Sequence, residues 1–550
     1  MITPNPTHEL SLEQLIAALN KKLFAECARV QLAMPPMSRA LVAMLATEVR
    51  SLKSKGNLGC SRCTLQIDVL EKRATDVLHE VVSLRNSLQP VNRLPPEVLA
   101  SCATFVSDTD PRPILPLTHV CRYWRRSITS NPKIWASIAT GWRWLTTLCL
   151  ERAGAVPLDV DITVSDIRSD EDFLEPLLPQ TSRIGSLRLA GYSTIETVAG
   201  DLPGFFHSSM QNLTSLELQQ TTESAELFPL NGTPIPPIFQ NVARLESLRL
   251  TRTPLYPTLL SITSLRELKL LGYTSLFRFG TFLGLLKSNP GLECVALDIQ
   301  FFPDSVKATS AGKVHLPRIR FLSITCSKPI DPKGLLSSIS LPRGVHLEVV
   351  STQADQSIKL GSFLPSPPTA LLELLAPITT IKTRLIPQEL HIFGNGSVFT
   401  FRSPKFLFDI HTELELFPGA AVRELYTSVG PRTYTVNGLS GPLRLLPALE
   451  TLAFSNTAFP LGLLSALTEK PVLCPALKTL AFFDCRIDSS VMNKLGEAIT
   501  ERRNSMAARL YRVVIVNSTG TPPDLASIRE LRKSVPCVEA RVDDKLPDLS

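Results

Sequence analysis

The chain lacks the features of a secreted or membrane-spanning protein. No uncharged apolar run reaches the roughly 20 residues that a transmembrane helix needs, and the opening MITPNPTHELSLEQ has no basic start followed by an apolar core. The 11 cysteines are scattered among apolar residues instead of being crowded at regular spacings, which predicts free thiols. We therefore expect an intracellular protein, located in the cytoplasm or the nucleus.

A strong excess of charge of one sign is also missing. The formal net charge is +7 over 550 residues, and only 19% of the residues are charged. Proteins that bind nucleic acid usually carry a concentrated basic patch, often with interleaved aromatic residues, and no such run occurs here. We therefore expect neither a nucleic-acid partner nor a membrane partner.

The motifs of common enzymes and cofactor sites are absent. The chain has no GxxxxGK[ST], GxGxxG, HExxH or GxSxG sequence, and its eight histidines lie far apart. Gly394-Asn395-Gly396 is typical of a turn, because no lysine or helix follows it in the place that a phosphate loop requires. We expect no enzyme, no cofactor and no metal site, while a hydrolase with a triad assembled from distant segments stays open as an alternative.

A heptad pattern lies ahead of residue 90. Its members recur at alternating steps of three and four, the a/d seam of a coiled coil, and predict one long helix over about residues 60–88. The seam consists of Cys60, Cys63, Ile67, Leu70, Ala74, Val77, Val81, Leu84 and Leu88. Packing within the chain and pairing into a homodimer both satisfy such a seam. Cys60 and Cys63 have CxxC spacing, but they fall on the seam without a second pair, which favours buried packing over metal binding.

Two further helices are predicted before the seam. Ser11 and Gln14 form a capping-box pair ahead of one apolar run. Pro35-Pro36 separates this run from a second amphipathic run that contains Met44 and Leu52. Both apolar faces need a partner, which is either the heptad helix or another chain.

The segment from Arg93 to Ser137 has the pattern of a compact helical docking module. Pro95 and Pro96 precede a helix-forming run, so we expect a helix to begin there with Glu97 in its first turn. The apolar side of this helix is predicted to consist of Leu94, Val98 and Leu99. A second run has the spacing of a single helical face at Leu117, Val120, Cys121, Trp124 and Ile128. A third apolar patch follows the stop at Asn131-Pro132 and contains Ile134, Trp135 and Ile138.

At these residues the sequence resembles the F-box domain, in particular that of the F-box proteins of mushroom-forming fungi (basidiomycetes). The resemblance is carried by Leu94-Pro95-Pro96-Glu97-Val98-Leu99, Val120-Cys121-Arg122-Tyr123-Trp124 and Pro132-Lys133-Ile134-Trp135. It implies that Leu94 to Leu99, Val120, Cys121, Trp124 and Trp135 bind the Skp-type adaptor of a cullin-RING ubiquitin ligase. The family usually has an Ile-Phe pair where this chain has Cys102 and Ala103. These smaller side chains bury less apolar area, which lowers the burial free energy by roughly 0.8 kcal/mol per missing methylene.

From about residue 150 onward an L-x-x-L-x-L pattern recurs. Its clear instances begin at Ile184, Leu213, Leu245, Leu265, Leu292, Ile319, Leu449, Leu477 and Leu510. The last two apolar residues of each unit lie two apart and so share one face of a strand, which predicts a short parallel strand per unit. Helix-like stretches at 281–286 and 491–499 separate such strands. The spacing of about 20 to 33 residues is close to that of leucine-rich repeats, while ordinary α/β layering is the alternative.

Between residues 350 and 440 the pattern is weaker. Val345-Leu347-Val349, Leu390-Ile392 and Leu425 are its best candidates, and 362–380 has the composition of a proline-bearing loop that enters a short helix. F-box proteins often carry leucine-rich repeats for target selection, so the resemblance extends to this region. The predicted target-binding positions between the apolar pairs are Arg188, Glu217, Arg249 and Lys269, followed by Ala296, Ser323, Ala453 and Ala481.

These expectations define an α/β protein with four parts. Residues 1–58 form a helical segment, 59–90 the heptad helix, 91–140 the F-box-like all-α module and 150–545 an irregular leucine-rich-repeat-like α/β solenoid. The expected function is that of a substrate-recognition subunit of a Skp-cullin-F-box ubiquitin ligase with an unidentified protein target. The alternative is a non-catalytic scaffold or regulatory binding protein whose F-box-like segment does not recruit a ligase, a reading that Cys102 and Ala103 keep open.

Overall fold

A computed structural model gives the structure of the chain in two compact units, Met1–Leu158 and Asp159–Ser550, which we call unit 1 and unit 2. The structure describes residues 89–106, 114–139, 143–164, 174–192, 209–221, 242–253, 257–272, 276–277, 279–298, 300–301, 313–326, 330–352, 360–365, 373–376, 378–384, 389–394, 396–403, 422–428, 440–455, 459–460, 462–485, 487–504, 509–516 and 525–541, with the single positions 47, 69, 72, 76, 79, 83, 86 and 87. The predicted helices of residues 1–58 and all nine seam residues of the heptad pattern lie outside the described residues. The described positions from Val69 to Ser87 are helical.

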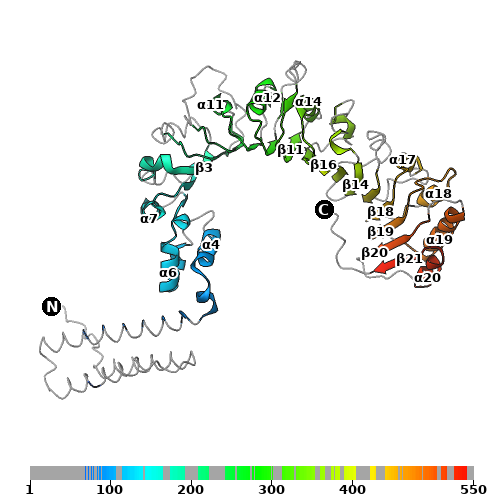
Figure 1. Cartoon of the computed structure of the whole chain (residues 1–550), viewed down its shortest axis with the longest axis horizontal. Coiled ribbons are helices and arrows are strands. Elements are labelled where there is room, and N and C mark those ends of the chain that lie inside the picture. The colour runs from blue at the N-terminus through cyan, green and yellow to red at the C-terminus, as the bar shows by residue number, and fades with distance from the viewer. Residues whose placement is uncertain are drawn as a thin grey trace, which may run out of the picture. The chain divides into compact units, whose positions relative to one another are not determined.

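Unit 1 is built from short helices and one short strand (Figure 1). In chain order these are η1 (Pro90–Arg93), α4 (Pro96–Val106), α5 (Ile114–Thr118), α6 (Arg122–Thr129), η2 (Pro132–Trp135), β1 (Ser137–Ala139) and α7 (Arg143–Ala153). The helix predicted at the proline pair is confirmed: α4 begins at Pro96, and the carbonyl of Pro95 accepts the N–H groups of Val98 and Leu99 at 3.0 and 3.2 Å.

The prediction of one continuous helical face from Leu117 to Ile128 is wrong. The chain leaves the helix after Thr118, and α6 begins only at Arg122. Cys121 is extended, with φ −160° and ψ 174°, and Arg125 Nε donates to the Thr118 carbonyl at 2.9 Å. The guanidinium thus donates to a carbonyl that would accept a backbone N–H if the helix continued. Val120 is 53% exposed at the break.

The interior of unit 1 is formed by apolar residues from α4, α5, α6, η2 and α7. These are Leu99, Ala103, Ile114, Ile128, Ile134, Trp135, Leu145 and Cys149. Trp135 is fully buried, its Nε1 donates to the Ile128 carbonyl at 3.0 Å, and the guanidinium of Arg152 lies 4.3 Å from the centre of its ring. A cation over an indole face is attractive, so α7 is held to the rest of the unit at this point.

Unit 2 contains a large and mostly parallel β-sheet. The sheet strands are β2 (Leu158–Thr163), β3 (Ile184–Tyr192), β4 (Ser215–Gln220), β5 (Ser247–Thr251), β6 (Glu267–Leu271), β8 (Cys294–Asp298), β11 (Phe321–Cys326), β13 (His346–Ser351), β14 (Ile378–Arg384), β15 (Glu389–Gly394), β16 (Ser397–Arg402), β17 (Glu424–Ser428), β18 (Thr451–Ser455), β19 (Thr479–Phe483), β20 (Arg512–Val516) and β21 (Cys537–Arg541). Two small parallel pairs accompany it: β7 (Leu276–Phe277) with β9 (Gln300–Phe301), and β10 (Val314–His315) with β12 (Ile339–Ser340).

The strand register follows the apolar pattern of the sequence. Leu216 of β4 lies between Leu187 and Leu248 of its neighbours, and the row continues through Leu268, Val295, Leu322 and Leu347. A second such row runs through Leu452, Leu480 and Val513. Every apolar residue of the nine predicted units is at most 4% exposed. The prediction of one parallel strand per clear unit is therefore confirmed.

Strand order reverses between β13 and β17, where the sequence pattern was weakest. β13 pairs not with β14 but with β16, and the order then runs β16, β15, β14, β17. Among these strands only β15 is antiparallel to its neighbours, because a tight turn at Gly396, with φ +74°, links it to β16. Gly394 and Gly396 of the expected turn thus lie at the end of a hairpin, whereas Asn395 is outside the described residues. Residues 378–380, expected in a loop and helix, belong to β14.

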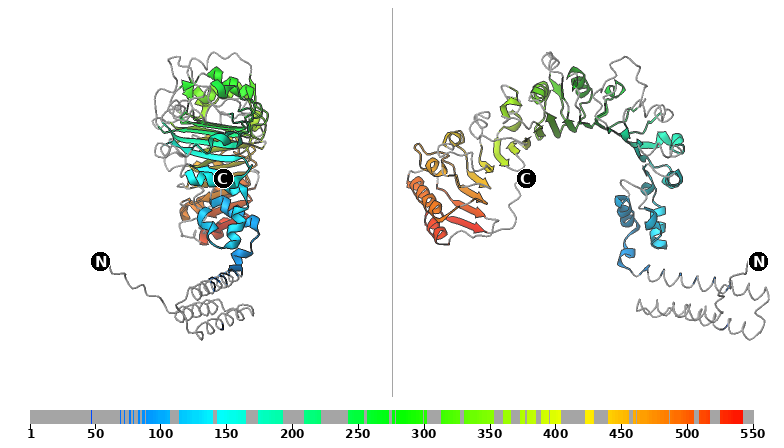
Figure 2. Two further views of the ribbon diagram at one scale, coloured as in Figure 1. Left: turned by 90° about the vertical axis from the view of Figure 1, so that its left-hand side faces the viewer. Right: turned by 180° about the vertical axis from the view of Figure 1, so that it is seen from behind.

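The helices of unit 2 lie along one side of the sheet (Figures 1 and 2). They are η4 (Leu178–Arg183), α11 (Pro257–Leu260), α12 (Phe279–Ser288), α14 (Ile330–Ser338), η5 (Leu360–Ser362), α17 (Ser440–Arg444), α18 (Gly462–Thr468), α19 (Ser489–Asn504) and α20 (Leu525–Ser534). The predicted helical stretches at 281–286 and 491–499 lie within α12 and α19. We call the opposite side of the sheet, which bears the alternate strand residues such as Arg188 and Glu217, the open face.

The fold is therefore mixed α/β with a large, mostly parallel sheet. None of the helices within the described ranges combines the length and apolar character needed to cross a membrane. The cysteines that the structure describes are free thiols, as the sequence predicts: Cys102, Cys121, Cys149, Cys294, Cys326, Cys474, Cys485 and Cys537.

Candidate protein-binding surfaces

The residues predicted to bind an adaptor fall into two groups in unit 1. Pro95, Pro96, Glu97, Val98 and Val120 are exposed, and Leu94, Cys121 and Trp124 are partly exposed. Leu99 and Trp135 are 2% and 0% exposed. The first group lies where a partner can reach it, whereas the last two form the interior that supports α4.

One face of α4 carries apolar side chains in solvent. Val98 is 42% exposed, Phe105 is 86% exposed, and Cys102 is an exposed thiol between them. Their spacing of four and three places all three along one side of the helix. We call Val98, Cys102 and Phe105 the α4 stripe. Isolated exposed apolar residues are ordinary, but an aligned row on a helix that also packs on a core is typical of a docking surface.

Phe105 was not among the predicted contact residues. Cys102 and Ala103 together depart from the F-box pattern, but the structure separates them, because Ala103 is 1% exposed and packs in the interior. Only Cys102 belongs to the exposed surface. The seven-residue step from Val98 to Phe105 is the signal that could have identified the stripe.

Side chains of α6 hold the segment before α4 in place. Trp124 Nε1 donates to Asn92 Oδ1 at 2.5 Å, and the Tyr123 hydroxyl donates to the Leu94 carbonyl at 2.5 Å. Trp124 and Leu94 were predicted as contact residues, and their side chains also join two elements of the unit. The orientation of α4 is thus fixed by polar contacts as well as by its buried side.

The predicted target-binding residues of unit 2 lie together on the open face. Register neighbours place Arg188, Glu217, Arg249 and Lys269 in one row across β3, β4, β5 and β6. The row continues through Ala296 and Ser323. The structure therefore brings these residues into a continuous line, although they come from segments about 20 to 30 residues apart.

The charged part of this row is mixed in sign, because Arg188, Arg249 and Lys269 are positive and Glu217 is negative. Arg188 contacts Asp161 at 2.9 Å and Glu217 at 3.5 Å, and Glu217 lies 3.6 Å from Arg249. The arginine side chains are 44% and 45% exposed, and ion pairs this exposed contribute only about 0–1 kcal/mol to stability. The row, which we call the charged ladder, therefore matters little for folding and presents oriented charges to a partner.

Lys269 forms a tighter pair at the end of the ladder. Its ammonium lies 2.5 Å from Glu267 Oε1, and the Ser247 hydroxyl donates to the other carboxylate oxygen at 2.8 Å. These contacts, chiefly the Lys269 ammonium, lower the pKa of Glu267 below its ordinary value. Nearby, burial raises the pKa of Asp298 even though the Gly272 N–H donates to its carboxylate.

A second polar cluster lies on β13, β15 and β16. Arg402 bridges Glu348 and Glu389, with both distances 2.7 Å. His391 lies 3.2 Å from Glu389 and 3.1 Å from the Thr400 hydroxyl. This series of carboxylate, imidazole and hydroxyl has the composition of a hydrolase triad, but Thr400 is 1% exposed and Glu389 already pairs with Arg402. The hydroxyl is thus closed to a substrate.

The far part of the open face is apolar, which corrects one expectation. Ala453 and Ala481 were expected at a target-binding surface, but they are 1% and 4% exposed. They belong to a buried cluster with Phe483 and Val516, and Tyr426 and Val514 pack against it. The large neighbours shield the small alanines, so accessible contact positions lie in the charged ladder instead.

Within the described ranges, no group of three or more His, Cys, Asp or Glu residues is arranged to hold a metal ion. No protein-family model matches this chain, and no curated protein sequence matches it either.

Proposed function

We propose that the protein is the substrate-recognition subunit of a Skp-cullin-F-box type ubiquitin ligase. Unit 1 docks on the Skp-type adaptor through the α4 stripe and the exposed residues around it, and unit 2 holds a protein target on its open face. The protein carries out no chemistry in this role. It raises the concentration of the target near a ligase that other subunits supply.

The observation that carries the proposal is the α4 stripe. Phe105 has most of its ring in solvent, and its burial against a partner would contribute about 1.5–3 kcal/mol. The stripe belongs to the segment whose sequence resembles the F-box domain: Val98 lies within the Leu94–Leu99 motif, and Cys102 and Phe105 follow it before the Val120–Trp124 motif. An intracellular site, in the cytoplasm or nucleus, is part of the same proposal, because the ligase subunits operate there.

Unit 2 supports the second half of the proposal. We infer that it is a divergent leucine-rich-repeat-like solenoid, because strands of similar length follow each other in parallel register with the same apolar positions buried. In such an array the strand side without helices is the binding side. The charged ladder is mixed in sign, which suits a protein surface with paired charges better than a single small metabolite.

Assembly of the complex from purified subunits tests the proposal. We expect the full-length chain to co-elute with adaptor, cullin and RING subunits in size-exclusion chromatography. The double variant Val98→Asp, Phe105→Asp should elute alone, because both carboxylates would be buried without a partner in the interface. The control is Thr104→Asp, which introduces a single carboxylate on α4 away from the stripe and should still co-elute. Elution of the unmodified chain apart from the ligase would contradict the proposal.

A second candidate is a binding protein that does not recruit a ligase. The exposure of Cys102 favours it, since a short thiol occupies the centre of the stripe where the family has a larger apolar residue. The replacement Cys102→Ile separates the two candidates. If the unmodified chain binds the adaptor measurably and Cys102→Ile binds it more tightly, the result supports the ligase subunit. If only Cys102→Ile binds the adaptor, the result supports a diverged module that does not recruit a ligase.

A further inference from the structure

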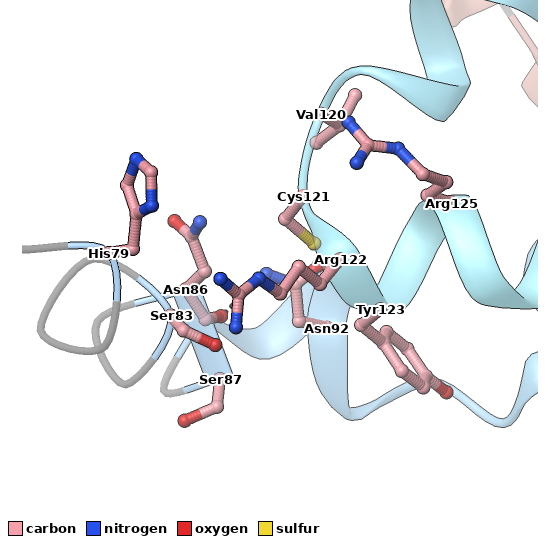
Figure 3. Close-up of a pocket in the computed structure, with 10 residues that line it drawn as sticks. All are labelled: His79, Ser83, Asn86, Ser87, Asn92, Val120, Cys121, Arg122, Tyr123 and Arg125. Carbon is pink, nitrogen blue, oxygen red and sulfur yellow. Dashed lines mark hydrogen bonds between the residues drawn. The ribbon is translucent and has the colours of Figure 1, made fainter. Parts of the chain in front are cut away.

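Unit 1 contains a polar pocket between its described helical positions 79, 83, 86 and 87 and the start of α6 (Figure 3). The pocket has a volume of about 490 Å³. It is lined by His79, Ser83, Asn86, Ser87, Asn92, Val120, Cys121, Arg122, Tyr123 and Arg125. This size is within the range of about 300–1,000 Å³ that is usual for ligand sites.

Among the residues that the structure describes, the lining is rich in hydrogen-bond donors and contains no carboxylate. Two guanidinium groups come from Arg122 and Arg125, two hydroxyls from Ser83 and Ser87, and a further donor from the Asn86 amide. Figure 3 shows the Arg122 side chain directed toward Asn86 and Ser83 across the pocket. Within the part of the chain that the structure describes, no hydrogen bond or ion pair involves the Arg122 side chain. The Arg122 guanidinium thus has no counter-ion among the described residues.

Arg125 is held differently. Its Nε donates to the Thr118 carbonyl at 2.9 Å, which fixes the side chain beside Val120 at the pocket wall. Its positive charge is therefore preorganised, because the rotamer entropy of a long side chain is lost on folding and not on binding. Arg122 and Arg125 together give the pocket a positive potential that no acid among the described lining residues offsets.

We propose that this pocket binds the phosphate group of a phosphorylated serine or threonine in a partner protein. A phosphate monoester has three oxygens that accept hydrogen bonds from several directions, so it can bind donors that come from two different elements. Guanidinium groups bind phosphate in bidentate fashion. The pocket volume leaves room for the side chain and backbone that carry the phosphate. This inference does not rest on the α4 stripe, which shares no residue with the pocket, although Val120 and Cys121 of the lining are also predicted adaptor-binding residues.

Single-stranded nucleic acid is a poorer match for the same charges. Binding of successive bases needs accessible aromatic faces, and the described lining contains one phenol ring, that of Tyr123, and one imidazole, that of His79. The Tyr123 ring is turned away from Arg122 in Figure 3, and its hydroxyl donates to the Leu94 carbonyl at 2.5 Å. Among the described lining residues, the pocket therefore offers mainly charge and hydrogen bonds, with the His79 imidazole as its one exposed ring.

Fluorescence anisotropy with the full-length chain tests this inference. The probe is fluorescein-labelled Gly-Ala-phosphoserine-Ala-Gly, compared with the same peptide bearing unmodified serine. We expect the phosphopeptide to bind at least about tenfold more tightly, the size of a single charge-assisted hydrogen bond. Arg122→Ala should remove that difference, and Arg122→Lys should restore part of it because lysine supplies charge without the planar fork.

Arg126→Ala is the matched control, since Arg126 is exposed on the same helix and does not line the pocket. It should leave the phosphopeptide affinity within about twofold of the unmodified chain, as surface changes away from a contact usually do. An equal loss in Arg122→Ala and Arg126→Ala would overturn the inference, because it would show a diffuse attraction to positive charge. Equal binding of phosphorylated and unmodified peptide would also overturn it. Unlabelled phosphopeptide and inorganic phosphate are also compared as competitors of the labelled probe. Equal displacement by both at the same concentration would refute the proposal that the phosphate is bound as part of a protein.

Discussion

The indole Nε1 of Trp124 donates a hydrogen bond to Oδ1 of Asn92 at 2.5 Å, and this contact joins α6 to the turn that precedes α4. Asn92 in turn donates to the carbonyl of Asn86. The two contacts link three successive segments of unit 1 through one side chain. The position of α4, and with it the direction of its exposed stripe, therefore depends on a polar residue outside the helix.

Replacement of Asn92 by alanine should destabilise unit 1. The partly buried indole N–H would lose its acceptor, at a cost of about 1–2 kcal/mol. All four tryptophans of the chain, Trp124, Trp135, Trp142 and Trp144, lie in unit 1, so tryptophan fluorescence in urea measures this unit within the intact protein. Asn92→Asp keeps an acceptor and should lower the unfolding midpoint less. An unchanged midpoint in Asn92→Ala would show that the contact does not stabilise the unit.

The pair of Glu267 and Lys269 should make stability depend on pH. Because the folded-state pKa of Glu267 is lowered, chiefly by Lys269, its contribution is complete above the unfolded-state pKa and is lost as the pH falls through the folded-state pKa. Lys269→Met should therefore reduce the free energy of unfolding at pH 7 and have no such effect at a pH below both values. Urea unfolding followed by far-UV circular dichroism at both pH values measures this, and an equal loss at both would contradict it.

Asp298 should show the opposite sign. Burial raises its folded-state pKa, so the charged carboxylate destabilises the folded state once the pH exceeds the unfolded-state pKa. Asp298→Asn keeps an oxygen for the Gly272 N–H and should raise the urea midpoint at pH 7. The gain should vanish in acid, where the aspartate is protonated in both states. A lower midpoint in the variant at pH 7 would refute the assigned role of burial.

Two cysteines of unit 1 should differ sharply in reactivity. Cys102 is exposed on α4, whereas Cys149 is buried and its burial raises the thiol pKa to about 12. Thiolate is the reactive form, so iodoacetamide should label Cys102 in the folded protein and Cys149 only after unfolding. Mass spectrometry of peptides from folded and urea-treated samples distinguishes the two. Labelling of Cys149 in the folded state at the rate of Cys102 would be inconsistent with the packing of α7.

The strands of unit 2 could be predicted from sequence because their signal is local. In units such as Leu213-Leu216-Leu218, the apolar spacing within six residues determines which side of the strand is buried, and parallel neighbours repeat it. The order of β14, β15 and β16 could not be predicted in the same way. It depends on which strand edge the β15–β16 hairpin pairs with. Contacts between residues about 50 apart determine this pairing, such as the hydrogen bond from the Gly344 N–H to the Ser397 hydroxyl at 2.9 Å.

The helical module shows a similar division. The proline pair specified the start of α4, since the effect of proline on backbone geometry is intrinsic to the residue. The break before Arg122 was missed because spacing alone does not reveal that Arg125 reaches back to the Thr118 carbonyl. The burial of Ala481 was missed for a related reason: exposure of a small side chain is decided by larger neighbours such as Phe483.

The central claim is that the α4 stripe binds a Skp-type adaptor, and isothermal titration calorimetry of the purified full-length chain with purified adaptor tests it most directly. The account predicts saturable binding that is weakened by at least about tenfold in Phe105→Asp, since loss of a buried aromatic ring costs more than 1.4 kcal/mol. Thr104→Asp should bind like the unmodified chain. Binding that is absent in the unmodified chain, or equally strong in Phe105→Asp, would contradict the claim.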